Sequence, residues 1–234
     1  RLPVRERCNA RGEVLLALDE TTIEDLIPVL RDENVESVAI ALMHAYANPD
    51  HERRAAAVLR AALPDLWITL ASEVCPEIRE YERMSTASAN AYVQPLMASY
   101  LADLDDRLRA EGAQCPLYMM TSGGGLTTVE TARRHPIRLV ESGPAGGAIL
   151  AGRIAMECGL DQVLSYDMGG TTAKICLIDD GRPQTSRTFE VDRQYRFTKG
   201  SGLPLRIPVI EMVEIGAGGG SIAQIDNLGR IQVG

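Results

Sequence analysis

A short segment beginning near residue 163 combines a carboxylate, two glycines and two threonines behind a predicted strand. Asp167 is expected to end a buried strand, where a carboxylate can hold a water molecule bound to Mg²⁺. The residues that follow offer amide and hydroxyl donors to phosphate oxygens: Gly169, Gly170, Thr171 and Thr172. A Gly-Gly pair is also common in hairpin turns, so the segment alone supports a phosphate site and a simple turn equally.

Three further glycine-rich segments occur in the same chain. Residues 122–125 follow a predicted strand at 117–121, and residues 141–147 follow a predicted strand at 137–140. A helix is expected after them, at about 148–157. Residues 216–221 stand between two extended segments and could equally mark a tight crossing of two strands. Four such segments favour a nucleotide site over a set of unrelated turns, because glycine lets phosphate oxygens approach the backbone.

Other well-known sites are missing from the sequence. It contains no G-x-x-x-x-G-K-[S/T] segment, no G-x-G-x-x-G within a β–α–β unit and no G-x-S-x-G elbow. Five cysteines are odd in number and far apart, which indicates a reducing compartment rather than a disulfide framework. The isolated histidines, His44, His51 and His135, are expected to be structural or surface residues rather than metal ligands.

The composition is that of a globular protein, with 45% hydrophobic residues and a net charge of −8. This acidity argues against nucleic acid as a partner, and no apolar run approaches the length of a membrane span. An apolar run at 35–46, a helical pattern at 51–63 and a strand at 67–71 follow a β–α–β rhythm, so an α/β fold is expected. A long helical pattern covers 77–111, with Pro95 kinking or dividing it. A chain that begins at Arg1 and stops just after a strand-like stretch is expected to be a piece of a longer protein.

The order of these motifs resembles the hydantoinase A / 5-oxoprolinase family, which includes a subunit of acetone carboxylase. The resemblance rests on Asp-Met-Gly-Gly-Thr-Thr at 167–172, on the three other glycine-rich segments, and on Ile-Arg-Glu-Tyr-Glu-Arg-Met-Ser-Thr at 78–86. It implies that residues 1–75 end the N-terminal hydantoinase/oxoprolinase region and that residues 76–234 begin the hydantoinase A core domain. It also implies an actin-like, ribonuclease-H-type ATPase fold, with incomplete lobes in this chain.

The resemblance further implies an ATP site with Mg²⁺. Residues 167–172 match the second phosphate loop of the actin-like fold, with Asp167 holding Mg²⁺ through water. Glu141 falls near the carboxylate that positions metal or water beside the γ-phosphate. The nucleotide-binding residues expected on this basis are Ser122, Gly123, Gly124, Ser142, Gly143, Gly169, Gly170, Thr171, Thr172, Gly218, Gly219 and Gly220.

The implied activity is ATP-dependent opening of a cyclic amide or imide, such as 5-oxoproline or a hydantoin, by phosphorylation of the amide oxygen. A second, hydantoinase B-type subunit or domain, an oligomer and a cytoplasmic location are expected, with no nucleic-acid or membrane partner. Two alternatives are a carboxylase subunit of the acetone carboxylase type and a non-catalytic module that docks a partner subunit.

Two departures from the family pattern bear on these expectations. No earlier D-x-G-G-T loop occurs in the chain, so these residues alone are expected to be inactive. Lys174 follows Ala173 where many relatives carry an acidic residue. Its side chain is expected to be solvated, with contact to phosphate as the alternative.

Overall fold

The computed structural model describes residues 1–195, 198 and 200–233, which form two compact units. Unit 1 comprises Arg1–Met119, Thr127–Arg138 and Thr188–Ile207, and unit 2 comprises Met120–Leu126, Leu139–Arg187 and Pro208–Gly234. This division does not follow the expected boundary between residues 75 and 76. That boundary concerns regions of the family and stays a prediction.

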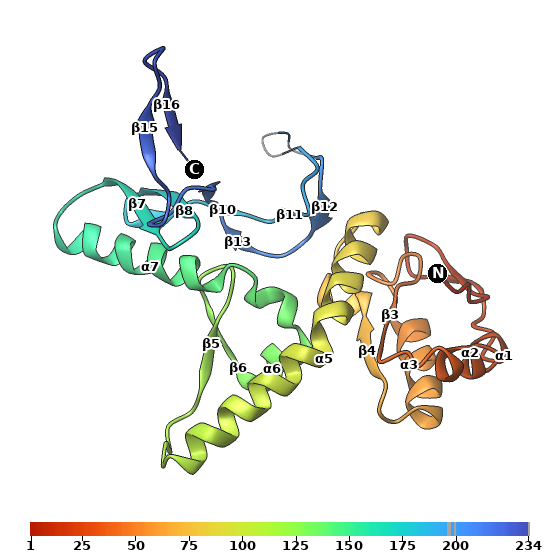
Figure 1. Cartoon of the computed structure of the whole chain (residues 1–234). Coiled ribbons are helices and arrows are strands. Elements are labelled where there is room, and N and C mark those ends of the chain that lie inside the picture. The colour runs from red at the N-terminus through yellow and green to blue at the C-terminus, as the bar shows by residue number, and fades with distance from the viewer. Residues whose placement is uncertain (196–197, 199, 234) are drawn as a thin grey trace. The chain divides into compact units, whose positions relative to one another are not determined.

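Unit 1 is built around a β–α–β element, as the sequence predicts (Figure 1). Strands β3 (Ser37–Ile40) and β4 (Trp67–Leu70) pair in parallel, and helix α3 (Asp50–Ala62) connects them. Parallel strands require such a crossover connection. One face of helix α3 packs against the two strands and covers them with apolar side chains. The core consists of Leu18, Ile23, Leu30, Ile40, Ala55, Ala56, Leu59 and Leu70.

Helix α5 (Glu80–Ala110) is the longest element of unit 1. It runs through Pro95 without being divided. Its Ala91 carbonyl accepts a hydrogen bond of 2.6 Å from the Ser37 hydroxyl, which joins the helix to β3. The remaining elements of the unit are β1 (Arg7–Cys8), β2 (Val14–Leu16), α1 (Thr21–Glu24), α2 (Ile27–Asp32), α4 (Ala71–Val74), α6 (Val129–Arg134), β11 (Phe189–Val191) and β12 (Leu203–Leu205).

Unit 2 consists of helix α7 (Ser142–Glu157) packed on a sheet of order β14-β8-β7. Along this path lie β7 (Gln162–Met168), β8 (Ala173–Asp179) and β14 (Val213–Ile215), paired antiparallel, and a fourth strand, β9 (Arg182–Pro183), also pairs with β8. The core contains Ala145, Ala148, Cys176, Ile178 and Ile210. The remaining strands of unit 2 are β10 (Thr185–Ser186), β13 (Val209–Ile210), β15 (Ala223–Ile225) and β16 (Ile231–Val233).

Strands β5 (Tyr118–Met120) and β6 (Leu126–Thr128) form a hairpin through which the chain passes from one unit to the other and back. The expected strand at 137–140 is wrong, since Pro136–Leu139 is a short 3₁₀ helix. Pro136 cannot donate a ladder hydrogen bond, which disfavours a strand there. No helix in the described part of the chain has both the length and the apolarity that a membrane span requires.

Candidate functional site

All the residues expected to bind nucleotide or metal lie in unit 2. The β7–β8 hairpin presents the central segment, and its turn is closed by a hydrogen bond of 3.0 Å from the Gly169 amide to the Thr172 carbonyl. Strand β7 is exposed or half-buried at every position, so the expectation that Asp167 ends a buried strand is wrong. The reason is that β7 is an edge strand of the sheet. Asp167 itself is exposed at the end of this strand.

Three charged residues form a row across the sheet. Asp167 on β7 and Glu214 on β14 both lie directly opposite Lys174 on β8. Directly opposed residues share one face of a sheet. This face carries Cys176 and Ile178 at alternate positions of β8, so it is the face that packs against α7.

Lys174 is held by carboxylates rather than by water. Its ammonium group forms an ion pair with Glu141 and a second, at 3.7 Å, with Glu214. The Lys174 side chain is only 16% exposed, so the expectation of a solvated residue is wrong. One lysine among Glu141, Asp167 and Glu214 leaves two negative charges uncompensated. Polyphosphate could therefore approach this place only together with cations.

Glu141 lies immediately before helix α7. It adopts a left-handed backbone conformation with φ of 59°. The helix begins at Ser142, six residues earlier than the sequence pattern suggests, so residues 142–147 are helical rather than a glycine-rich turn. A methyl group at Gly143 would meet no atom within 4 Å, so this helix N-terminus is open. Amide groups in a first helical turn point outward and favour anions.

A second glycine-rich loop packs directly on the β7–β8 turn. A Cβ atom at Gly218 would lie 2.5 Å from both the carbonyl carbon of Gly170 and the amide nitrogen of Thr171. Gly219 donates its amide to the Gly169 carbonyl at 2.9 Å, and Gly220 donates to the Gly170 carbonyl at 3.3 Å. Residue 218 must therefore be glycine for the two loops to touch.

These contacts also show which amides are engaged. Those of Gly219 and Gly220 are committed to the neighbouring loop, which leaves them unsuited to bind phosphate in this arrangement. Among the described residues, the amides of Gly170 and Thr171 have no backbone partner. Gly170 and Thr171 are exposed residues, and their amides are donors of this turn that the neighbouring loop does not engage through a backbone hydrogen bond.

The turn at 122–125 serves packing. Ser122 is 1% exposed, and its carbonyl accepts a hydrogen bond of 2.9 Å from the Ile210 amide. Gly124 has φ of 81°, and a Cβ atom there would lie 2.8 Å from the Ile149 side chain. A Cβ atom at Gly123 would lie 3.3 Å from the Cβ atom of Pro208. Nucleotide contact by Ser122, Gly123 and Gly124 stays a prediction.

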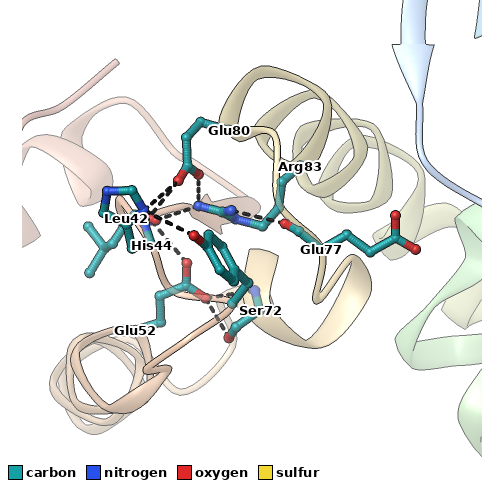
Figure 2. A network of polar contacts seen from close by, with 8 residues as sticks. Leu42, His44, Glu52, Ser72, Glu77, Glu80 and Arg83 are labelled. Carbon is teal, nitrogen blue, oxygen red and sulfur yellow. Dashed lines mark hydrogen bonds and ion pairs between the residues drawn. The ribbon is translucent and has the colours of Figure 1, made fainter. Parts of the chain in front are cut away.

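Unit 1 contains a buried polar network that the sequence analysis did not identify (Figure 2). At its centre the Arg83 guanidinium, with a fully buried side chain, forms an ion pair with Glu80 and donates to the carbonyls of Leu42 at 2.8 Å and Glu77 at 3.2 Å. It also lies 5.3 Å from the centre of the Tyr46 ring. Burial lowers the pKa of this guanidinium, while nearby Glu52 opposes that effect.

Glu52 extends the network (Figure 2). Its carboxylate accepts hydrogen bonds from the Leu42 amide at 3.0 Å and from the amide and hydroxyl of Ser72 at 2.9 and 2.7 Å. Burial raises the pKa of Glu52, and these hydrogen bonds counteract the increase. The network joins α3, α4, α5 and the segment after β3. Because its charges are paired inside the unit, it stabilises the fold and is not arranged to bind a ligand.

Unit 1 also has an open cavity of about 630 Å³ beside β4. Trp67, Gln94, Arg134 and His135 are among its lining residues. Within the described residues, the Nδ1 atom of His135 is buried without a hydrogen-bond partner. Burial, and then the charges of Arg138 and Arg134, lower the pKa of His135. This histidine is therefore neutral in the folded protein near pH 7.

Comparison with known proteins agrees with the motifs. The chain is 38% identical over its whole length to the caprolactamase subunit alpha of Pseudomonas jessenii, covering 32% of that protein. It is 30% identical to 5-oxoprolinase of Saccharomyces cerevisiae over 92% of the chain and 16% of the relative. The chain thus spans about a third or less of these relatives.

Solved structures show the same mixed α/β fold. The crystal structure of ATP-dependent caprolactamase from Pseudomonas jessenii matches with a TM-score of 0.81 and 36% identity, covering 99% of this chain and 32% of that one. Nucleotide-free acetone carboxylase matches with a TM-score of 0.79 at 24% identity, over the same shares of the two chains. The family model described as hydantoinase/oxoprolinase matches residues 83–234, and that of its N-terminal region matches residues 1–63. With well over half of its residues matched by that model, the chain belongs to the hydantoinase/oxoprolinase family.

Proposed function

We propose that this chain is part of an ATP-dependent enzyme that opens a cyclic amide or imide, and that unit 2 supplies part of its nucleotide site. In this proposal the fold is that of an actin-like ATPase whose lobes are incomplete here. Relatives named caprolactamase and 5-oxoprolinase support the class of substrate. The whole enzyme includes a second, hydantoinase B-type subunit or domain, consistent with relatives that are named as subunits.

The observation that carries the proposal is the contact between the two glycine loops beside the charged row. Gly218 lies against Gly170 and Thr171, and the amides of these two residues have no backbone partner in the described part of the chain. A phosphate group would be bound by these amides and by the threonine hydroxyls.

The residues present also fit Mg²⁺. Carboxylate oxygens and water are its preferred ligands, and Asp167 is an exposed carboxylate in a place with two uncompensated negative charges. The ion would neutralise charge on the phosphates. Asp167 would hold it through water, while Lys174 fixes the orientation of Glu141 so that this carboxylate can position a water molecule.

The proposed reaction transfers the γ-phosphoryl group of ATP to the oxygen of the ring amide. The bond from the γ-phosphorus to the bridging oxygen of ATP breaks, and a new phosphorus–oxygen bond forms at the amide. ADP leaves with the bridging oxygen. Water then adds to the activated carbon and the ring carbon–nitrogen bond breaks, which gives an acyl phosphate and a free amine. A second water hydrolyses the acyl phosphate to the carboxylate and phosphate. Positioning and charge neutralisation are sufficient for the first step, so the site needs no covalent nucleophile.

The test is the Asp167→Ala substitution in the full-length protein with its partner subunit. Substrate-dependent ATP hydrolysis is expected to fall on the order of 100-fold or more, because charge stabilisation at the transferring phosphoryl group is lost. Cyclic amides to be tested are 5-oxoproline, a hydantoin and caprolactam. Asp161→Ala, an exposed carboxylate in the same unit, is the matched control and should retain activity. Unchanged turnover in Asp167→Ala would remove the proposed role of this residue.

Two alternatives are separated by the same preparation. A carboxylase of the acetone carboxylase type would hydrolyse ATP with acetone and bicarbonate and leave cyclic amides intact. A docking module would show no magnesium-dependent ATP binding by calorimetry. The proposal expects binding that requires Mg²⁺ and turnover that requires the cyclic amide.

A further inference from the structure

Three side chains that can bind metal meet inside unit 1, far in sequence from the residues of the proposed nucleotide site. Cys8 belongs to β1, Glu6 lies two residues before it, and His51 is the second residue of α3. In an extended segment, residues two apart point to the same side, so Glu6 and Cys8 face His51 together. All three are buried: Cys8 is 2% exposed, and the side chains of Glu6 and His51 are each 5% exposed.

Both neighbours in this cluster share one ring nitrogen of His51. The Nδ1 atom of His51 lies 2.9 Å from a carboxylate oxygen of Glu6 and 3.7 Å from the sulfur of Cys8. In a neutral imidazole, one ring nitrogen either donates a proton or accepts one. Nδ1 can therefore donate to the carboxylate or accept from the thiol, but it cannot do both. A cation placed among the three donor atoms would bind all of them at once.

The spacing is close to that of a tetrahedral metal site. With Zn–N and Zn–O bonds of about 2.0 Å and a Zn–S bond of about 2.3 Å, tetrahedral angles separate N from O by about 3.3 Å and S from N by about 3.5 Å. The observed separations are 2.9 and 3.7 Å, and all three donor atoms lie within 4.8 Å of one another. Movements of a few tenths of an ångström would bring the His51 nitrogen to the ideal distances from the Glu6 oxygen and the Cys8 sulfur.

The donor types select the metal. Thiolate and imidazole bind Zn²⁺ and Co²⁺ well, whereas Mg²⁺ and Ca²⁺ prefer sites made of oxygen atoms. We propose that Glu6, Cys8 and His51 form a binding site for a zinc-like divalent cation, with three protein ligands and a fourth position for water. The burial of the cluster within one unit gives the ion a stabilising role, linking the N-terminal strand to helix α3.

Cobalt binding tests the proposal on the full-length protein. After chelation and dialysis, Co²⁺ is added, and the thiolate-to-cobalt charge-transfer band and the intense visible bands of tetrahedral cobalt are recorded. One equivalent per chain is expected at this site, with loss of its spectrum in both Cys8→Ala and His51→Ala. Cys115→Ala removes an exposed cysteine elsewhere and is the matched control. A spectrum without these bands, or one that persists in both variants, would overturn the proposal.

A stability measurement guards against variants that lose the site only because they unfold. Zn²⁺ is expected to raise the thermal unfolding temperature of the metal-free wild type and of Asp167→Ala, but not that of folded Cys8→Ala. Because Asp167→Ala should keep this response, failure of the metal site and failure of the nucleotide site give different results. An equal Zn²⁺ response in wild type and Cys8→Ala would contradict a metal site at Cys8.

Discussion

Unit 1 and unit 2 each hold a cation among carboxylates, but in opposite surroundings. In unit 1 the Arg83 side chain is fully buried, and Glu80 and two backbone carbonyls bind it. In unit 2 Lys174 is paired with Glu141 and with Glu214, whose side chain is 54% exposed, and exposed loop residues lie close by in sequence. The difference teaches that a charge cluster stabilises the fold where it is buried and its charges are paired, and can receive a ligand where it is open and unbalanced.

The largest effect is expected from removing the buried cation of unit 1, and removing the cation of unit 2 supplies the comparison. Arg83→Met leaves Glu80 and Glu52 without their buried partner and should lower the free energy of unfolding by about 3–5 kcal/mol. Lys174→Met affects a partly exposed group and should cost about 1 kcal/mol or less. Urea unfolding of the full-length protein measures both.

The exposed Arg107, on the same helix as Arg83, supplies the control, and Arg107→Met should leave the unfolding midpoint unchanged. If Lys174→Met destabilised the protein as strongly as Arg83→Met, the contrast between a closed network and an open one would be wrong.

A smaller effect is expected at the two glycine loops. Gly218→Ala places a methyl group 2.5 Å from the backbone of Gly170 and Thr171. It should lower the free energy of unfolding by about 1–3 kcal/mol and should also weaken ATP binding. Gly143→Ala meets open space at the start of α7 and should stabilise the helix by less than about 1 kcal/mol. Thermal unfolding and ATP titration distinguish the two variants.

If the open helix N-terminus contacts phosphate, Gly143→Ala should lower ATP affinity while it preserves stability. Equal stability of Gly218→Ala and wild type would show that the two loops do not touch as described.

The smallest effect concerns pH and unit 1. Burial and the charges of Arg138 and Arg134 lower the folded-state pKa of His135 below its ordinary value of 6.5. Since the unfolded chain then binds the proton more readily, the contribution of His135 to stability is fully present above pH 6.5 and is lost as the pH falls through the folded-state pKa. The unfolding temperature of the wild type should decrease as the pH is lowered from 7.5 to 5. The unfolding temperature of His135→Gln should decrease less over the same range. The same slope in both proteins would assign the decrease to other groups.

Several features could be predicted from local sequence. The β–α–β element of unit 1, the turn after β7 and the order of the family motifs follow from hydrophobic periodicity and from glycine positions, which act over a few residues. The start of α7 was predicted too late, because the glycines at 143, 146 and 147 disguise a helix that packing on β8 stabilises. Burial of Asp167 was predicted wrongly, because an edge position in a sheet depends on strand order.

The sequence by itself determined the family, the α/β class and the segment at 167–172, since these depend on residue types at short fixed spacing. Only the tertiary structure decided that Lys174 is enclosed by carboxylates, that Gly218 touches Gly170, and that Cys8 meets His51. The last two residues are 43 positions apart, and nothing in their spacing indicates that they meet. The physical reason is that such contacts arise from strand register and helix packing, which place distant residues side by side without leaving a periodic signal in the chain.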